Sequence, residues 1–492
     1  MTRLIGTLCT LALVVSLLGI ASLIGHDARM TRGHVSELPH PDLMSRPDNL
    51  LGINVYLLGA SPNEQATALD NIQSAGFGWI RQVFDWSVLE PAPNKFNWAS
   101  VDALVEAAQH RNLGLIAVLT NSPLWARPSA PNGTATGPPD DPKDFASFAT
   151  VVAARYGGQL DFYQIWDEPN LQIGWGSRAP SASEYKRLLQ ASYNAIHSVD
   201  PDAVLLVAGL APTTEKGPQN ISDILYMRQL YDAGAGPYFD VAAGKPYGFN
   251  SSQEDRTTDT DVLNFSRFIL LREEMERAGD VDKLLWATNF GWYTGQAVIA
   301  PSTTWGNVTA RNQRDYTLGA YRRAYTEWPW AGVLVLENYQ PAGGPDNPRW
   351  GFALLSPKGD PSSLMMALRD RANSISYSAA PVGVHRADTP YAQYEGSWEF
   401  SELGADIPQD GVAEITFTFT GTDLGIIVRR ANYRAYLYVE IDGEPASALP
   451  RDMNGEAYQV LTSPDLAPRV ELLPLASNLS AGVHTAKLRA ER

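Results

Sequence analysis

An acidic pair stands where a predicted strand ends. In the stretch 162–170, hydrophobic and polar residues alternate up to Trp166, and Asp167-Glu168 is followed at once by Pro169. Proline lacks an N–H and fixes φ, so it stops strand pairing, and we expect the strand to end on Asp167 and Glu168. Carboxylates can transfer protons or attack electrophilic carbon. Their place at the carboxyl end of a strand favours catalysis over the alternative, an ordinary acidic turn.

The elements around this pair alternate regularly. Short apolar strands are separated by amphipathic helical stretches, which is the pattern of a parallel sheet covered by helices. Eight such units fill residues 50–373, within the usual size of a closed (β/α)8 barrel. We therefore predict an α/β fold, a TIM barrel, with strands at residues 51–56, 78–83, 115–120, 162–168, 203–209, 239–244, 284–288 and 332–336.

The pattern changes near residue 379. Short strands with period-two alternation, such as 413–419 and 436–441, are separated by Gly-Thr-Asp and Asp-Gly turns. This predicts an all-β antiparallel sandwich, jelly-roll-like, over residues 379–492. Its many tyrosines leave two interpretations open: a carbohydrate-binding module, or a structural domain whose aromatic residues fill alternate core positions.

The amino-terminal residues form a third region. Leu4 to Ile24 are almost wholly apolar and are preceded by Arg3, which predicts a signal peptide or signal anchor over residues 1–26. Residues 27–49 are rich in proline and polar residues and read as a linker. We expect an extracytoplasmic protein, secreted or held at a membrane only by its first segment.

Composition excludes several classes of function. A net charge of −16 argues against nucleic acid as a partner. No histidine stands at a predicted strand end and the single cysteine is Cys9, so no histidine- or cysteine-bound metal site is expected. No phosphate-binding loop, dinucleotide fingerprint or G-x-S-x-G elbow appears in context, and we expect no cofactor.

The other strand ends carry amides, aromatic rings and a few charged groups. Carboxylates act at the anomeric carbon of a sugar and indoles stack on pyranose faces, so this set indicates a carbohydrate substrate. Each tryptophan could equally belong to the core. The candidate substrate-binding residues are Arg81, Asp85, Trp86, Asn121, Trp125, Asp167, Lys245, Tyr247, Trp292, Tyr339 and Trp350.

Trp166-Asp167-Glu168-Pro169-Asn170 resembles the W-N-E-P-N motif of clan A retaining glycoside hydrolases, closest to their xylosidase/iduronidase-like branch. The resemblance covers about residues 51–372 and implies a glycoside hydrolase with a C-terminal β-sandwich module. Glu168 would be the general acid/base, which protonates the leaving oxygen and later activates water. Further matches, in the right order, are Arg81, Pro123–Ala126, Pro246-Tyr247, Thr288–Trp292 and Arg349–Leu355.

Three positions depart from the pattern of that family. Asp167 stands where the family has asparagine, and Lys245 stands where it has histidine. The glutamate nucleophile of its T-E-F-G-W segment is replaced by Asn289. An amide cannot form a glycosyl-enzyme ester, so the ordinary double displacement is not available through this position.

Three interpretations of Asn289 follow. Another carboxylate, Glu337 or Asp85, could serve as the base of an inverting reaction. The acetamido group of the substrate could be the nucleophile, oriented by Asn289 or Asp167. The barrel could instead be a non-catalytic carbohydrate-binding pseudoglycosidase of the cell envelope, or a structural scaffold there. For Lys245, the simplest interpretation is an ion pair that holds Asp167.

Overall fold

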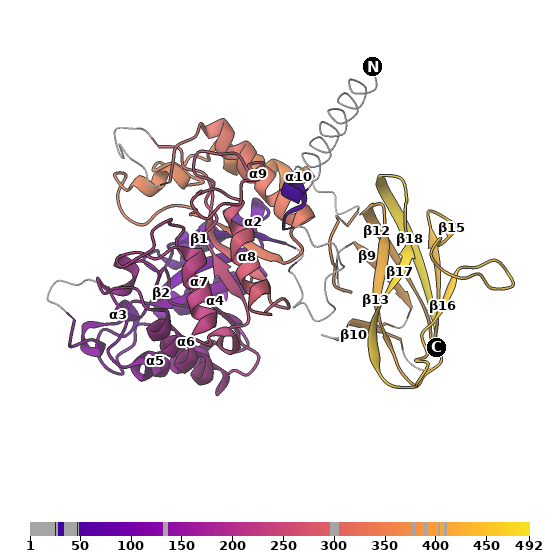
Figure 1. Ribbon diagram of the computed structural model, residues 1–492, viewed down its shortest axis with the longest axis horizontal. Helices are drawn as coiled ribbons and strands as arrows, with labels where there is room; N and C mark the ends of the chain where they lie inside the picture. Colours follow the sequence, from indigo (N-terminus) through magenta and orange to yellow (C-terminus); the bar gives the residue numbers. More distant parts are fainter. Residues whose placement is uncertain are drawn as a thin grey trace, which may run out of the picture.

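The computed structural model describes two domains along the chain (Figure 1). The described residues are 25, 28–33, 47, 49–130, 136–295, 305–374, 379–380, 382–387, 389, 391–396, 398–401, 404–407 and 411–492. The predicted signal segment lies almost wholly outside them. Within the described ranges, no helix is both long and apolar enough to cross a membrane.

The first domain is the predicted barrel. Its parallel strands form one sheet in the order β5-β4-β3-β2-β1-β8-β7-β6. Only the parallel bridges Leu206↔Val241 and Leu210↔Gly244 join the end strands β5 and β6, and they close the ring. The strands are β1 (Leu51–Val55), β2 (Trp79–Asp85), β3 (Gly114–Thr120), β4 (Phe162–Ile165), β5 (Val204–Leu206), β6 (Ala242–Gly244), β7 (Leu285–Phe290) and β8 (Ala331–Leu336).

Helices surround this ring of strands (Figure 1). They begin at recognisable caps: the side chain of Ser61 accepts from the Glu64 N–H while Glu64 bonds back, and Pro62 occupies the first helical turn. Their buried faces recur at helical spacing, as at Leu69 and Ile72. The helices are α2 (Pro62–Ser74), α3 (Trp86–Leu89), α4 (Ala99–Gln109), α5 (Pro142–Tyr156), α6 (Ala182–His197), α7 (Asp223–Asp232), α8 (Arg267–Arg277), α9 (Ala310–Glu327) and α10 (Ser363–Ser374).

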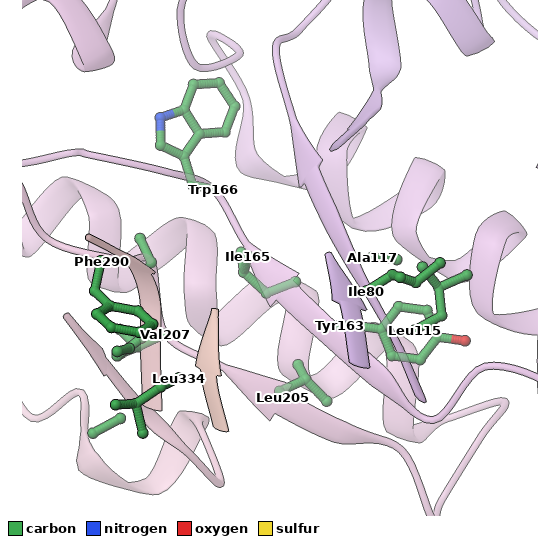
Figure 2. Packing of buried hydrophobic residues seen from close by; sticks show 14 of the residues in the cluster. Ile80, Leu115, Ala117, Tyr163, Ile165, Trp166, Leu205, Val207, Phe290 and Leu334 are labelled. Carbon is green, nitrogen blue, oxygen red and sulfur yellow. The ribbon is translucent and has the colours of Figure 1, made fainter. Parts of the chain in front are cut away.

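The barrel has two apolar layers. The larger lies between strands and helices, and Figure 2 shows some of the side chains that several strands contribute to it. A smaller cluster comes from the other faces of the strands and includes Ile116, Leu206 and Val333. Beside it, the ring of Trp79 packs edge-on against Phe162 and Trp286 at centroid distances of 4.9 and 5.2 Å. Trp79 begins β2, so these rings fill the amino-terminal end of the barrel and leave its carboxyl end for a site.

The second domain is all-β, as predicted. Its main sheet has the order β15-β14-β18-β12-β9, with β16 paired to β14, and it is accompanied by the pairs β13-β17 and β10-β11. Leu437, Val439 and Ile441 alternate inward to a separate core. The strands are β9 (Ala392–Gly396), β10 (Glu399–Ser401), β11 (Gly404–Asp406), β12 (Val412–Gly421), β13 (Leu424–Arg430), β14 (Tyr436–Ile441), β15 (Glu444–Pro445), β16 (Tyr458–Val460), β17 (Arg469–Ala476) and β18 (Gly482–Glu491).

Candidate active site

Strand β4 ends at Ile165, three residues before the predicted end at Glu168. Trp166 has a φ of 70° and Glu168 a φ of 49°, both in the left-handed region. Such a backbone conformation is unfavourable for residues other than glycine and is kept only where the surroundings impose it. The strand cannot continue through these angles, so the acidic pair stands on a turn above the sheet.

The left-handed turn also decides which side chains face the barrel interior. Alternation would place Trp166 on the same side as Gln164, inside the barrel. Instead the indole of Trp166 packs edge-on against Trp175 on the outer side, and its Nε1 donates to the Gly174 carbonyl at 2.8 Å. Asp167 takes the inner position, where Gln164 Nε2 donates to its Oδ1 at 3.1 Å. In Figure 2, Trp166 stands beyond the end of the strand that carries Ile165.

Lys245 joins the two acids. Its Nζ donates to Asp167 Oδ2 and to Glu168 Oε1, at 2.8 Å in each case. Burial alone would lower the pKa of Lys245, but the two carboxylates raise it above its usual value. Burial would raise the pKa of Asp167, and Lys245 and Arg81 together hold it below its usual value. The ion pair predicted for Lys245 is therefore present, and it also includes Glu168.

Arg81 contacts Asp167 and two neighbouring amide side chains. Its guanidinium donates to Gln164 Oε1 at 2.8 Å and to Asn54 Oδ1 at 2.6 Å, and its Nη2 lies 3.2 Å from Asp167 Oδ1. Asn54 in turn donates to the carbonyls of Thr288 and Leu336 at 3.0 Å each. Charged and amide side chains from β1, β2 and β4 are thus fixed against one another.

Glu337, directly after β8, is the centre of a second group. Its Oε2 accepts from the Tyr247 hydroxyl at 2.5 Å and from Asn289 Nδ2 at 2.8 Å, while Arg349 donates to its Oε1. Glu337 is 1 % exposed. The pKa of Tyr247 lies well above its usual value because of burial and the nearby Glu337 charge.

The orientation of the Asn289 amide follows from this group. A carboxylate only accepts hydrogen bonds, so the NH2 of Asn289 must face Glu337. Its Oδ1 is then turned away, and this buried oxygen has no hydrogen-bond partner within the described part of the chain. A buried acceptor without a partner is costly, which makes this oxygen a position where a bound hydroxyl or N–H would be favourable.

The two groups share one space at the carboxyl ends of the strands. Glu168 and Glu337 both raise the pKa of Tyr247, after burial, and both raise that of Arg349. Burial and then Glu337 raise the pKa of Tyr56. We call Asp167, Glu168, Lys245, Arg81, Glu337, Tyr247, Asn289 and Arg349 the carboxylate site.

Two of the tryptophans that were predicted to bind substrate lie outside the carboxylate site. Trp86 and Trp292 are both 0 % exposed. Trp86 stacks on Phe148 at 5.3 Å and donates to Glu90 Oε2, and Trp292 donates to the Ser251 carbonyl. Their rings are enclosed by the core, so the expectation that they touch substrate is corrected. Tyr339 is 3 % exposed and also lies mostly inside the protein.

The remaining candidates occupy the rim of the barrel. Asn121 Nδ2 donates to Asp85 Oδ2 at 2.8 Å, and Asp85 caps α3 through the Ser87 N–H. Trp125 is partly exposed and donates to the Glu90 carbonyl at 3.1 Å. Trp350 is partly exposed as well. None of these residues hydrogen-bonds to the carboxylate site within the described part of the chain, so they lie around the site and not within it.

Sequence reasoning left out one member of the carboxylate site, Arg349, and two residues beside it, Tyr56 and Asn54. Arg349 lies in the segment that the family resemblance covers, but nothing local connects it to Glu337. Tyr56 follows β1 and is 37 % exposed, and its position at a strand end was the available signal. Asn54 lies inside β1, and a polar amide within an otherwise apolar strand was the signal that could have identified it. Among the described residues, no group of three or more His, Cys, Asp or Glu is arranged to hold a metal ion.

Comparison with known proteins agrees with this geometry. The family model "Cellulase (glycosyl hydrolase family 5)" matches residues 44–232. A family 39 glycoside hydrolase from Bacteroides cellulosilyticus WH2 has a similar structure, with a TM-score of 0.53, 18 % identity, and coverage of 89 % of this chain and 83 % of that one. The GH39 enzyme from Xanthomonas axonopodis pv. citri gives a TM-score of 0.50, 13 % identity and coverage of 92 % and 96 %. The search of curated proteins finds no match.

The family match and the solved structures cover different parts of the chain. The family model spans the strands that carry Arg81 and Glu168, and the solved structures share the fold over both domains. The protein has a (β/α)8 barrel followed by a β-sandwich, and its similarity over residues 44–232 supports an enzyme of the clan A glycoside hydrolase type.

Proposed function

We propose that the protein hydrolyses O-glycosidic bonds of an oligo- or polysaccharide at the carboxylate site, with Glu168 as general acid and Glu337 as the opposing base. The observation that carries this proposal is the pair of carboxylates. Glu168 and Glu337 come from β4 and β8, are held by different donors, and act on the same neighbours, Tyr247 and Arg349.

The proposed reaction is a single displacement. Glu168 gives its proton to the leaving oxygen as the C1–O bond breaks. Water attacks C1 from the opposite face, and Glu337 accepts the proton that the water loses. An inverting pair needs carboxyl groups roughly 6.5–9.5 Å apart, against roughly 5–5.5 Å for a retaining pair. Asn289 occupies the position that the family resemblance assigns to the retaining nucleophile. Glu337 lies behind Asn289 and accepts a hydrogen bond from it, which favours the wider carboxyl–carboxyl spacing of an inverting pair.

Glu337 needs access to water in this mechanism. Among its three donors, Arg349 is the most exposed, with a side chain that is 37 % accessible. Withdrawal of Arg349 would free Oε1, while Tyr247 and Asn289 continue to orient the carboxylate through Oε2. Arg349 therefore acts in this proposal as a movable partner of the base.

The test is hydrolysis of a panel of aryl glycosides and polysaccharides by the chain without its first 30 or so residues. We expect Glu168→Gln and Glu337→Gln each to lower kcat by about 100-fold or more, because each removes a proton-transfer group. Glu106→Gln on the outer helix α4, a residue 75 % exposed, is the matched control. NMR of the first product should show an inverted anomer; a retained anomer would overturn the proposed mechanism, and an active Glu168→Gln variant would overturn the function.

A second candidate function rests on the same contacts. Both oxygens of Glu337 are occupied and the residue is 1 % exposed. A barrel that only binds sugar needs no accessible base, so a carbohydrate-binding pseudoglycosidase is the alternative. Carbohydrate binding without any turnover, with Asn289→Glu restoring hydrolysis, would select it.

We propose also that the protein works outside the cytoplasm. The support is the apolar stretch Leu4–Ile24 with Arg3 before it. Fractionation of cells that express the full chain tests this: the protein should appear in the medium or the membrane fraction, and recovery in the cytosol would contradict it.

A further inference from the structure

A groove opens beside the carboxylate site, between α2 and the segment that follows β8. Its volume is about 570 Å³. Ligand pockets usually measure roughly 300–1,000 Å³, so this space is large enough for a small molecule or part of a chain. We call it the α2 groove. It is lined by Tyr56, Leu57, Ala60, Asn63, Glu64, Thr67, Ala68, Asn71, Tyr339, Gln340, Pro341, Leu355 and Gly359.

The α2 groove begins where the carboxylate site ends. Tyr339 is the second residue after Glu337, and its N–H donates to the Asn54 carbonyl at 2.9 Å, which fixes the end of β8 against the end of β1. Tyr56, the first residue after β1, lines the groove. The charges of Glu337, Arg349, Arg81 and Lys245 all affect the Tyr56 hydroxyl. Tyr56 therefore belongs to both spaces.

The lining is mostly uncharged and has several hydrogen-bonding groups without a partner among the described residues. The side-chain amides of Asn63 and Gln340 and the hydroxyl of Tyr56 make no hydrogen bond within the described residues. Glu64 is the one charged lining residue, and its carboxylate already accepts from the Ser61 N–H and hydroxyl at 2.8 and 2.7 Å. Amides both donate and accept, as the neighbouring hydroxyls of a sugar ring do.

We infer that the α2 groove binds the part of a neutral oligosaccharide that extends from the bond being cleaved, with Tyr56 at the junction. This inference rests on the proposed function, since it takes the carboxylate site as the position of the cleaved bond. It makes the preferred substrate a chain of several sugars and not a short glycoside. Asn63 and Gln340 contribute hydrogen bonds that only the longer substrates reach.

The test uses the full chain and series of xylo-, cello- and laminari-oligosaccharides of two to six units, with the 4-nitrophenyl monoglycoside of each sugar. We expect kcat/KM to rise with chain length. The Asn63→Ala and Gln340→Ala variants should each lower kcat/KM about 3- to 10-fold for the longest substrate, the effect of one hydrogen bond, and less than twofold for the monoglycoside. Gln109→Ala, an exposed amide at the end of α4, is the control.

The outcomes separate this inference from the proposed function. If the monoglycoside is cleaved but chain length and groove variants have no effect, the groove inference is wrong and the hydrolase remains. If no substrate is cleaved but calorimetry shows hexasaccharide binding that both groove variants weaken, the groove stands and the catalytic function fails. If calorimetry and kinetics both show nothing, both are overturned.

Discussion

At the scale of single residues, Asn289 decides how much negative charge the barrel holds opposite Glu168. Its NH2 group supports Glu337 without adding charge. A carboxylate in its place would lie against another carboxylate, and two such groups in contact cannot both ionise readily.

This predicts the effect of Asn289→Asp. At neutral pH one of the two carboxyl groups should keep a proton, and Glu337 would lose its capacity to act as base. We expect kcat/KM to fall about 10- to 100-fold at pH 7, measured as a full pH–rate profile. Asn312→Asp, in the first turn of α9, is the control. An unchanged rate at pH 7 would exclude Glu337 as the base.

Lys245 has a different influence on the same reaction. Its ammonium lies 2.8 Å from Glu168 Oε1 and 2.8 Å from Asp167 Oδ2, so it holds both carboxylates in place. The raised pKa of Lys245 keeps the ammonium charged throughout the neutral range.

Lys245→Met should lower kcat about 10- to 100-fold, because Asp167 and Glu168 lose the charged donor that holds both of them. Hydrolysis rates of both proteins measure the loss, and circular dichroism confirms that the variant is folded. An unchanged kcat in a folded variant would show that Lys245 is not needed to position the two acids.

At the scale of elements, α7 and α8 are held by a buried ion pair. Arg267, which begins α8, donates to Asp223, which begins α7, at 2.7 Å, and both side chains are 2 % exposed. Arg267 also donates to the carbonyls of Thr213 and Thr260 at 3.1 and 2.7 Å. This one side chain therefore fixes two helix starts and two loops on the β6 side of the barrel.

Removal of Asp223 should be strongly destabilising. Asp223→Ala leaves the Arg267 charge buried without its partner, and we expect a loss of about 3–5 kcal/mol in the free energy of unfolding. Urea denaturation followed by tryptophan fluorescence measures it. Asp232→Ala, exposed at the end of the same helix, should change stability by less than about 0.5 kcal/mol. Equal effects for the two variants would contradict the argument.

Strand order and strand number were predictable from the sequence because each apolar run is short and ends at a turn-forming residue. The residues at which the strands begin and end were less predictable. The predicted strands 203–209 and 239–244 are reduced to Val204–Leu206 and Ala242–Gly244. Residues outside these shorter strands still face the core, so their apolar pattern continues where the ladder pairing does not.

The carboxylate site was predictable only where one segment carries the signal. The acidic pair before Pro169 was identified because the strand, the acids and the proline are adjacent. The contact between Glu337 and Arg349 depends on how a loop returns over the barrel, and no local pattern encodes it. Trp86 and Trp292 follow strands, as surface platforms do, but a tryptophan at such a position can equally turn into the core.

At the scale of the whole molecule, the two domains have separate apolar cores. The barrel clusters and the sandwich cluster share no residue. Each domain can therefore respond separately to temperature or pH. His484 in the sandwich should make a separate response of that domain to pH measurable.

His484, in β18, faces Asp442 in the turn after β14. Its Nδ1 lies 2.5 Å from Asp442 Oδ2, and its Nε2 lies 2.7 Å from the Ser480 carbonyl. These acceptors, Asp442 first, raise the pKa of His484, while the hydrogen bond from His484 lowers that of Asp442. Both shifts favour the charged pair in the folded state.

The sign of the pH effect follows. A raised histidine pKa gives stability that is complete below the unfolded value of about 6.5 and disappears as the pH rises through the higher folded value. The lowered pKa of Asp442 gives stability that is lost in strong acid. In thermal unfolding of the full chain we expect the sandwich transition to move down between pH 5.5 and 8.5, and His484→Gln to reduce that movement. A movement of the same size in the variant would contradict the assignment.

The way the ring of strands closes has a mechanical consequence. Between β5 and β6 only two bridges connect the barrel, whereas β7, β8 and β1 are joined by longer ladders. The Glu168 N–H donates to the Gly209 carbonyl on the β5 side, and Lys245 follows β6. Glu168 and Lys245 are thus attached to either side of the junction with the fewest ladder pairs, whereas Glu337 follows a strand that pairs with neighbours on both sides. The Lys245–Glu168 separation therefore depends on how this one seam of the ring is held together, whereas the contacts of Glu337 do not cross it.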